Sequence, residues 1–386
     1  MSPLYELLYQ GDFFNTTFGK SHCLIKAGLP QVVGELEPED VLDLCCADTV
    51  SSRLLIQDQQ DNWQLHHSPL DPDLLDETLS DPELRCSVLV QNLENWSLPL
   101  ARLWTHFCAP TWLQDDIMVS YAPPGGSVGP HFDAYDVFLV QLHGKRHWQL
   151  GGFTQPDTPL RSDQPINLVS DIGGVVFDQV LEPGDVLYVP PGQIHHGVAV
   201  DDCLTLSFGL RSPSAATLLD HALGELASSD SLSRPLMQNA EEFSNLLTSG
   251  SALTPDLVNQ IKDSLIELLQ RSDQADWSAA LAKALSARRF SYEPEEELAS
   301  AEEIEEALNS GYLLIKEPST KLIITLSPDA VYCAEEEVVC ASSQEFELLS
   351  QLAQSKSLGA ECLVSTSALK LVEWMERGIV TLLEPE

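Results

Sequence analysis

The stretch Gly129-Pro130-His131-Phe132-Asp133, followed by the apolar run Val137 to Leu142, decides how this sequence folds. In a β-strand, residues i and i+2 point to the same side, so His131 and Asp133 would converge while Phe132 turns away. Two imidazoles and one carboxylate hold non-haem Fe(II) by one face and leave three coordination positions open. We therefore expect a metal site on an apolar strand, with the second histidine supplied by a neighbouring strand.

That second histidine follows a strand whose limits are visible in the sequence. Leu181 to Asp185 has the composition of a turn, Val186 to Val189 that of a strand, and Pro190-Pro191-Gly192 ends the strand. His195 leads into the next strand, from Gly197 to Val200, and its neighbour His196 must face the other way. The Pro-Pro-Gly-x-x-His pattern favours His195 as the ligand. The alternative is a core or solvated histidine, which is the commoner role of this residue type.

Together these motifs resemble the JmjC branch of the cupin-fold, 2-oxoglutarate-dependent oxygenases. Within that branch the chain is similar to the bacterial ribosomal oxygenases, which hydroxylate an arginine at C-3 in large-subunit ribosomal protein sixteen. The narrower resemblance lies in Pro123 to His131, Tyr135 to Phe138 and Ser207 to Arg211. It covers most of the chain and implies a double-stranded β-helix. It also implies Fe(II), 2-oxoglutarate and dioxygen as cofactor and cosubstrates, with His131, Asp133 and His195 as catalytic metal ligands.

The same resemblance assigns Arg146 to the distal carboxylate of 2-oxoglutarate. Ser120 is predicted as a second cosubstrate-binding residue. Chemistry supports Arg146 independently, because a guanidinium offers a planar fork and keeps its charge when buried. Arg146 shares its strand parity with Trp148 and Leu150, which places it on the apolar, inward side, opposite Lys145. The alternative is a basic pair kept at a hairpin end for solubility.

A substrate site is predicted on the strand that precedes the metal residues. By alternation Asp116, Met118 and Ser120 share one face, and an acidic group with an apolar flank suits a guanidinium and its methylene stem. The resemblance places Ser207 in the same site. Asp115 competes with Asp116 because strand register cannot be set to one residue from sequence. A capping or turn role for the two aspartates is a further alternative.

The net charge of the chain indicates which class of binding partner to expect. The chain has 386 residues, of which 20 are basic and 59 acidic, with a net charge of -39. Binding of nucleic acid by phosphate neutralisation needs clustered Lys and Arg, so it is not expected. A cationic partner, such as a basic large-subunit ribosomal protein, is favoured instead. An acidic surface that serves only solubility is the alternative.

Compartment and membrane association follow from what the sequence lacks. No stretch reaches the roughly 18 to 20 consecutive apolar residues of a membrane span, and the N-terminus shows no secretory signal. Nine cysteines without Cys-x-x-Cys spacing indicate neither a zinc site nor a disulfide framework. We expect a soluble cytoplasmic protein with reduced thiols.

An α+β chain of three domains is predicted from the changes in pattern. The catalytic double-stranded β-helix occupies residues 1–212, with helical decoration at Asp40 to Cys46 and Leu98 to Phe107. A helical region follows over residues 213–290, and the matching segment of the resembled family is a dimerisation domain. Its predicted helices are Ala215 to Ala227, Glu241 to Leu247, Asp256 to Leu269 and Trp277 to Leu285. The sequence leaves a homodimer and a simple connector both open.

A winged-helix-like domain is predicted over residues 291–386, after an acidic linker from Glu293 to Glu297. Its strands are placed at Tyr312 to Ile315, Leu322 to Leu326, Ala330 to Cys333, Val338 to Cys340 and Ile379 to Leu383, and its helices at Gln344 to Leu352 and Ser367 to Arg377. Winged helices often bind DNA, but the row Glu335 to Glu337 favours a protein contact or a structural role.

The expected reaction is the hydroxylation of an unactivated carbon, coupled to decarboxylation of 2-oxoglutarate to succinate. Two other classes stay open. A JmjC N-methyl-lysine demethylase would use the same site and release formaldehyde. A non-catalytic cupin scaffold would have no need of His131, Asp133, Arg146 and His195 together.

Overall fold

The structure is a computed structural model that describes residues 2–162, 164–227, 253–288 and 299–385. The chain divides into two compact units, Met1–Ser212 and Pro213–Glu386. The predicted helix from Glu241 to Leu247, the acidic linker and the boundary between residues 290 and 291 lie outside the described residues. The division into three domains therefore stays a prediction.

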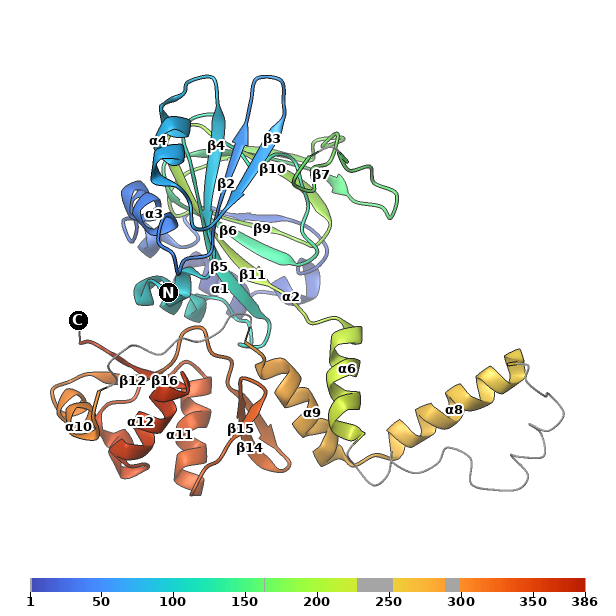
Figure 1. The fold of residues 1–386 in the computed structure, drawn as a ribbon, viewed down its shortest axis with the longest axis vertical. Helices are drawn as coiled ribbons and strands as arrows, with labels where there is room; N and C mark the ends of the chain where they lie inside the picture. Colours follow the sequence, from blue (N-terminus) through green and yellow to red (C-terminus); the bar gives the residue numbers. More distant parts are fainter. Residues whose placement is uncertain (1, 163, 228–252, 289–298, 386) are drawn as a thin grey trace. The chain divides into compact units, whose positions relative to one another are not determined.

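The N-terminal unit is built around a large antiparallel sheet (Figure 1). Its strands, in spatial order, are β1 (Cys23–Ile25), β9 (Val186–Val189), β6 (Asp136–His143), β11 (Cys203–Leu210), β5 (Gln114–Ala122), β4 (Arg85–Val90), β2 (Ser52–Gln57) and β3 (Trp63–His67). A smaller sheet has the order β10 (Gln193–Ala199), β7 (Arg146–Phe153) and β8 (Phe177–Leu181).

The two sheets pack against each other through apolar side chains. Leu139 of β6 and Leu187 of β9 share one buried cluster with Trp148 and Leu150 of β7 and with Leu181 of β8. The face of the large sheet that takes part in this packing is called the inner face below. The paired sheets form the predicted double-stranded β-helix.

Helices cover the opposite, outer face of the large sheet. They are α1 (Pro3–Gln10), α2 (Phe13–Thr16), α3 (Pro38–Cys45), α4 (Pro72–Ser80) and α5 (Leu98–Arg102), the last continued by a 3-10 turn from Leu103 to His106. Their apolar residues form one core with alternate strand residues such as Leu54, Ile117 and Val119. Alternation along each strand then leaves the residues between these for the inner face. The two predicted helical stretches correspond to α3 and to α5 with its 3-10 turn.

The prediction that His131 and Asp133 lie on an apolar strand is wrong. The strand β6 begins only at Asp136, and His131 makes no more than an isolated bridge, with His195. The local hydrogen bonds explain this, because the backbone of this segment meets β10 only at His195 and the preceding turn only at Gly192, without a continuous ladder. The next strand also starts earlier than predicted: β10 begins at Gln193 and contains both His195 and His196.

The C-terminal unit begins with helices close to the predicted ones. These are α6 (Ala215–Leu226), α8 (Pro255–Arg271) and α9 (Gln274–Ser286). Ala222 and Leu226 of α6 pack on Ala280 of α9 in a small buried cluster. In contrast, α8 is amphipathic but buries none of its residues.

The remainder of this unit is a winged helix around a core that includes Trp374. Its elements are α10 (Ala301–Asn309), β12 (Leu313–Lys316), β13 (Ile323–Leu326), β14 (Asp329–Cys333), β15 (Glu336–Val338), α11 (Ser343–Ala353), α12 (Ala368–Glu376) and β16 (Val380–Leu383). Apart from α10, which was not predicted from the sequence, they follow the predicted order, although β15 ends where the predicted strand from Val338 to Cys340 begins. No helix in the described part of either unit has the length and apolar character that a membrane crossing requires.

Candidate metal centre and anion site

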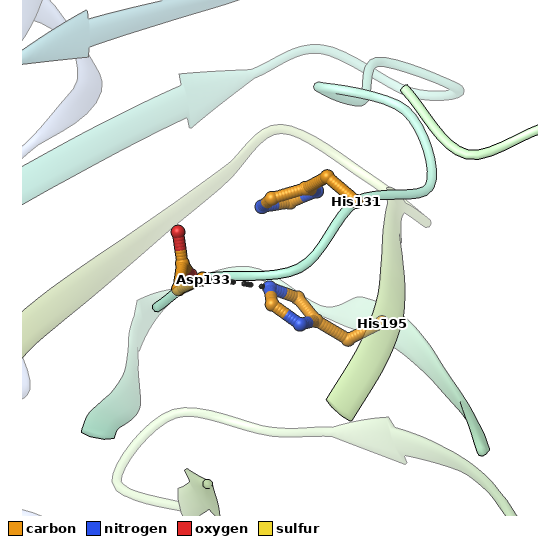
Figure 2. Close-up of side chains that lie close together, drawn as sticks. All are labelled: His131, Asp133 and His195. Atoms are coloured by element: carbon orange, nitrogen blue, oxygen red, sulfur yellow. Dashed lines mark ion pairs between the residues drawn. The ribbon is translucent and has the colours of Figure 1, made fainter. Parts of the chain in front are cut away.

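Two imidazoles and one carboxylate come together in the N-terminal unit (Figure 2). One ligand atom from each of His131, Asp133 and His195 lies within 4.8 Å of the others. Nε2 of His195 is 3.6 Å from Oδ2 of Asp133, and the two imidazole ring centres are 4.3 Å apart. Within the described residues this is the one such group of three or more His, Cys, Asp or Glu side chains. The predicted ligands are therefore brought together.

Backbone hydrogen bonds hold the two segments in register. The amide of His131 donates to the carbonyl of His195 over 3.0 Å, and the amide of His195 donates to the carbonyl of His131 over 2.8 Å. The amide of Gly192 donates to the carbonyl of Asp133 over 2.7 Å. These main-chain hydrogen bonds thus set the distance between the segment that carries His131 and Asp133 and the strand that carries His195.

Both rings are also oriented by main-chain carbonyls. Nδ1 of His131 lies 2.8 Å from the carbonyl oxygen of Gly129, and Nδ1 of His195 lies 3.0 Å from that of Gln193. A carbonyl oxygen can only accept, so each Nδ1 carries the proton and each Nε2 keeps its lone pair for a metal. Such outer hydrogen bonds are a regular feature of metal-binding histidines.

Gly129 is required where the chain turns into the site. Its φ of +78° lies in the left-handed region, and a Cβ there would approach a side-chain carbon of Leu168 to 2.5 Å. A larger residue would displace the carbonyl that orients His131. The glycine is thus tied to the geometry of a candidate ligand.

Burial keeps His195 neutral. Only 2% of the residue is exposed, and desolvation, followed by the charge of nearby His131, lowers its pKa to about 4. A neutral imidazole is the form that binds a metal. His196 lies outside the group: in β10 it pairs with Gln149, whereas His195 pairs with the inward Leu150.

A buried cation stands near this group. Arg146 is 2% exposed, and its Nη1 donates to Oγ of Ser120 over 3.1 Å. Its Nε and Nη2 are buried without a hydrogen-bond partner in the described structure. The indole of Trp148 connects the two sites, since its ring lies 5.8 Å from the guanidinium carbon of Arg146 and 5.9 Å from the ring of His195. Two unused charged donors in this place suit a carboxylate.

The neighbouring Lys145 faces away from the interior. Its Nζ lies 2.8 Å from Oε1 of Glu182, and both side chains are about half exposed. The structure therefore places Arg146 inward and Lys145 outward, which is the arrangement that strand parity predicts.

The predicted substrate residues occupy one face of β5 and the strand beside it. Asp116 and Ser120 are 7% and 4% exposed, and Met118 is half-buried between them. Ser207 of β11 pairs directly with Met118. Since Ile117 and Val119 belong to the outer core, these four residues lie on the inner face, the face that also carries the Arg146 contact.

Asp115 has a different environment from Asp116. Its Oδ2 lies 2.8 Å from Nε of Arg211, whose guanidinium carbon is 4.1 Å from the centre of the Tyr135 ring. Asp115 is thus paired with a cation of the protein itself, whereas Asp116 lies on the inner face with the other predicted substrate residues. Tyr135 and Arg211 lie in the quoted motifs, but no role was predicted for either of them.

Two family models match the chain. The model described as the JmjC domain covers residues 102–218, and the model described as a ROXA-like winged helix covers residues 267–376. They correspond to the strand-rich site region and to the C-terminal winged helix.

Relatives and solved structures extend this likeness over most of the chain. A Haemophilus influenzae protein named "Probable ribosomal oxygenase" is 37% identical, over 90% of this chain and 86% of its own. The Escherichia coli ribosomal protein uL16 3-hydroxylase is 30% identical, over 79% of each chain. The solved structure of the E. coli ribosomal oxygenase YcfD in complex with cobalt and 2-oxoglutarate has a TM-score of 0.75 at 26% identity and covers 97% of this chain and 98% of that one. The chain belongs to the JmjC-domain ribosomal oxygenases.

Proposed function

We propose that the protein is an Fe(II)- and 2-oxoglutarate-dependent oxygenase that hydroxylates C-3 of an arginine side chain in large-subunit ribosomal protein uL16. The observation that carries this proposal is the position of Arg146. Its buried guanidinium has two donors without a partner, and only the indole of Trp148 is described between it and the group of two imidazoles and a carboxylate. A metal site alone would have no need of that cation.

The donor set fits the metal. Two neutral imidazoles and one carboxylate are typical of non-haem Fe(II) oxygenases, because they leave coordination positions open for other ligands. His131, Asp133 and His195 would hold the ion, with both Nε2 atoms available. The cobalt in the YcfD complex supports a divalent ion in a related site.

The buried donors fit the cosubstrate. Nε and Nη2 of Arg146 would bind the distal carboxylate of 2-oxoglutarate, and Ser120 would hold the guanidinium in place through Nη1. When bound, the metal, 2-oxoglutarate and dioxygen supply the oxidising chemistry: one oxygen atom enters the substrate C–H bond, and the other enters succinate as carbon dioxide leaves.

The protein residues bind, orient and shield. Trp148, 3% exposed, excludes water between the metal ligands and Arg146, which strengthens the ion pair that Arg146 would form. The backbone bridge between His131 and His195 keeps the ligands in place before the metal arrives. Preorganisation of this kind reduces the reorganisation needed during the reaction.

The assignment of arginine as the target rests on the inner face of β5. Asp116 is a buried carboxylate and Met118 an apolar neighbour, which together match a guanidinium and its methylene stem. The net charge of -39 would attract a basic ribosomal protein. The name of the E. coli relative, a uL16 3-hydroxylase, supports the choice of protein and of carbon.

Three further assignments belong to the same proposal: a homodimer, a cytoplasmic location and the absence of direct binding to nucleic acid. The homodimer is supported by α8, whose exposed apolar residues include Val258, Leu265 and Ile266 at 42%, 49% and 45%. An amphipathic helix that buries no residue of its own needs a partner surface.

One experiment separates the candidate activities. Fe(II)-loaded protein is incubated with 2-oxoglutarate and purified uL16, and succinate, formaldehyde and peptide masses are measured. We expect succinate in step with a +16 Da arginine peptide. Formaldehyde without that peptide would indicate demethylation, and the absence of both products would indicate a scaffold.

A further inference from the structure

Arg53 lies on the same face of the large sheet as the proposed substrate residues. In the ladder, Arg53 of β2 pairs with Leu89 of β4, and Leu89 pairs with Ser120 of β5. Directly paired residues of neighbouring strands point to the same side, so Arg53 shares the inner face with Ser120. The flanking Leu54 belongs to the outer core, in agreement with this orientation.

The guanidinium of Arg53 reaches the proposed substrate residues. Its Nη2 lies 3.8 Å from Sδ of Met118. Met118 is two residues from Asp116 on β5 and pairs with Ser207 of β11. Arg53 therefore approaches the substrate side of the site, whereas Arg146 contacts Ser120 on the cosubstrate side.

Arg53 lacks the partner that an arginine in this chain would be expected to have. Acidic residues outnumber basic ones by 59 to 20, yet Arg53 forms no ion pair within the described residues. Its Nε is buried with no hydrogen-bond partner, and a methionine sulfur is only a weak acceptor for Nη2. A half-buried guanidinium in this state loses part of its hydration without a compensating bond.

The cosubstrate does not account for these donors. Under the proposed function Arg146 binds the distal carboxylate of 2-oxoglutarate, and the open coordination positions of the metal would take its other end. What remains for Arg53 is the protein substrate, because the residue that Arg53 contacts, Met118, lies beside Asp116 on the inner face of β5. The main-chain carbonyls and any acidic side chain near the target arginine are acceptors of the kind that a guanidinium binds.

We propose that Arg53 is a substrate-binding residue whose guanidinium donates to an acceptor oxygen of the polypeptide beside the target arginine. Its charge also repels the target guanidinium and so directs it toward Asp116. Two opposite charges on one face then determine the direction in which the substrate chain lies. This inference rests on the proposed function and adds a residue that selects a polypeptide over free arginine.

The test compares Arg53→Met with Arg85→Met, which removes an exposed arginine of β4 and serves as the matched control. Three quantities are measured for each protein: the KM and kcat for purified uL16, the Kd of 2-oxoglutarate for the cobalt-loaded protein by calorimetry, and the thermal unfolding midpoint. We expect Arg53→Met to raise the KM for uL16 by roughly tenfold or more, because a hydrogen bond to a charged group is lost. The kcat, the Kd of 2-oxoglutarate and the midpoint should stay close to the wild type.

Two results overturn the inference. An unchanged KM for uL16 would remove Arg53 from substrate binding, and a raised Kd of 2-oxoglutarate would assign it to the cosubstrate. If Arg53→Met lowers the unfolding midpoint, Arg53→Gln is used instead, since it keeps a polar side chain but removes the charge that strengthens the proposed hydrogen bond. A wild-type KM in that folded variant would overturn the inference equally.

A further experiment with uL16 peptides identifies the oxygen that accepts the hydrogen bond from Arg53. A uL16 peptide whose acidic residues are replaced by their amides should lose its dependence on Arg53 if a side chain is the partner, and keep it if a carbonyl is. Failure of the proposed function looks different from failure of this inference. If the proposed function is wrong, the wild type itself would neither bind 2-oxoglutarate nor modify uL16.

Discussion

Oγ of Ser120 accepts a hydrogen bond from Nη1 of Arg146 at 3.1 Å, and both residues are almost fully buried. The serine satisfies one end of the guanidinium and leaves the other end to an external anion. Ser120, predicted as a cosubstrate residue, contacts Arg146 and so would act on the cosubstrate through it.

Removal of Arg146 should therefore weaken 2-oxoglutarate binding specifically. We expect Arg146→Ala to raise the Kd of 2-oxoglutarate by roughly two orders of magnitude, because a buried carboxylate would lose its charged partner. Metal content, measured by atomic absorption, should change little. Lys145→Ala is the control, since that side chain is exposed and pairs with Glu182. Equal effects of the two substitutions would contradict the assignment.

The three candidate ligands should behave alike and differently from their neighbour. We expect His131→Ala, Asp133→Ala and His195→Ala each to lose bound metal and succinate release, since each would leave an incomplete ligand set. His196→Ala should keep most of both, because its side chain lies outside the group. An inactive His196 variant beside an active His195 variant would reverse the assignment.

Substitutions of the two adjacent aspartates should affect different measurements, hydroxylation for Asp116 and thermal stability for Asp115. Asp116→Asn is expected to lower hydroxylation of uL16 at least tenfold, because it removes a charged acceptor for the target guanidinium. Asp115→Asn should instead lower the unfolding midpoint, because it breaks the ion pair with Arg211. Full activity of Asp116→Asn would remove that residue from the substrate site.

Ionic strength should change the rate at which uL16 associates with the protein, but not the binding of 2-oxoglutarate in the buried site. With 59 acidic residues against 20 basic ones, the field attracts a basic protein, and salt shortens its reach to about 10 Å at 0.1 M. The kcat/KM for uL16 should fall steeply as salt rises, while the Kd of 2-oxoglutarate changes little. A flat profile for uL16 would leave the acidic surface with a role in solubility alone.

Glu94 should make stability depend on pH. Burial raises the pKa of its carboxyl to about 7, above that of an unfolded glutamate, so the folded state binds the extra proton between about pH 4.5 and 7. The free energy of unfolding therefore falls as pH rises through this window. Glu94→Gln should remove this loss, and its gain over the wild type should grow from pH 4.5 to 7 in urea titrations. The exposed Glu77→Gln is the control, and a constant difference across the window would argue against a buried, protonated Glu94.

Local patterns in the sequence predicted those features of the site that depend on one or two residues. The two-residue spacing of His131 and Asp133 and the turn before His195 were enough to predict that they converge. The strand around His131 was predicted wrongly, because strand formation depends on where backbone amides find acceptors. Here the acceptor is the carbonyl of His195, 64 residues away in the chain.

Long-range pairing explains what could not be predicted. Asp115 and Asp116 would exchange roles if the strand register shifted by one residue, and the ion pair between Asp115 and Arg211, 96 residues away, distinguishes Asp115. Arg53 stands in the apolar stretch Ser-Arg-Leu-Leu-Ile, where an arginine is expected to be solvated. Its contact with Met118 depends on the order of strands in the sheet.

The reciprocal hydrogen bonds between His131 and His195 also make their amides reporters of local opening. Neither amide can exchange its hydrogen with solvent until this bridge opens, so their exchange rates measure how often the two halves of the site separate. Slow exchange in the metal-free protein would mean that the ion enters a site already formed. Fast exchange that slows on metal addition would mean that the ion itself closes the gap.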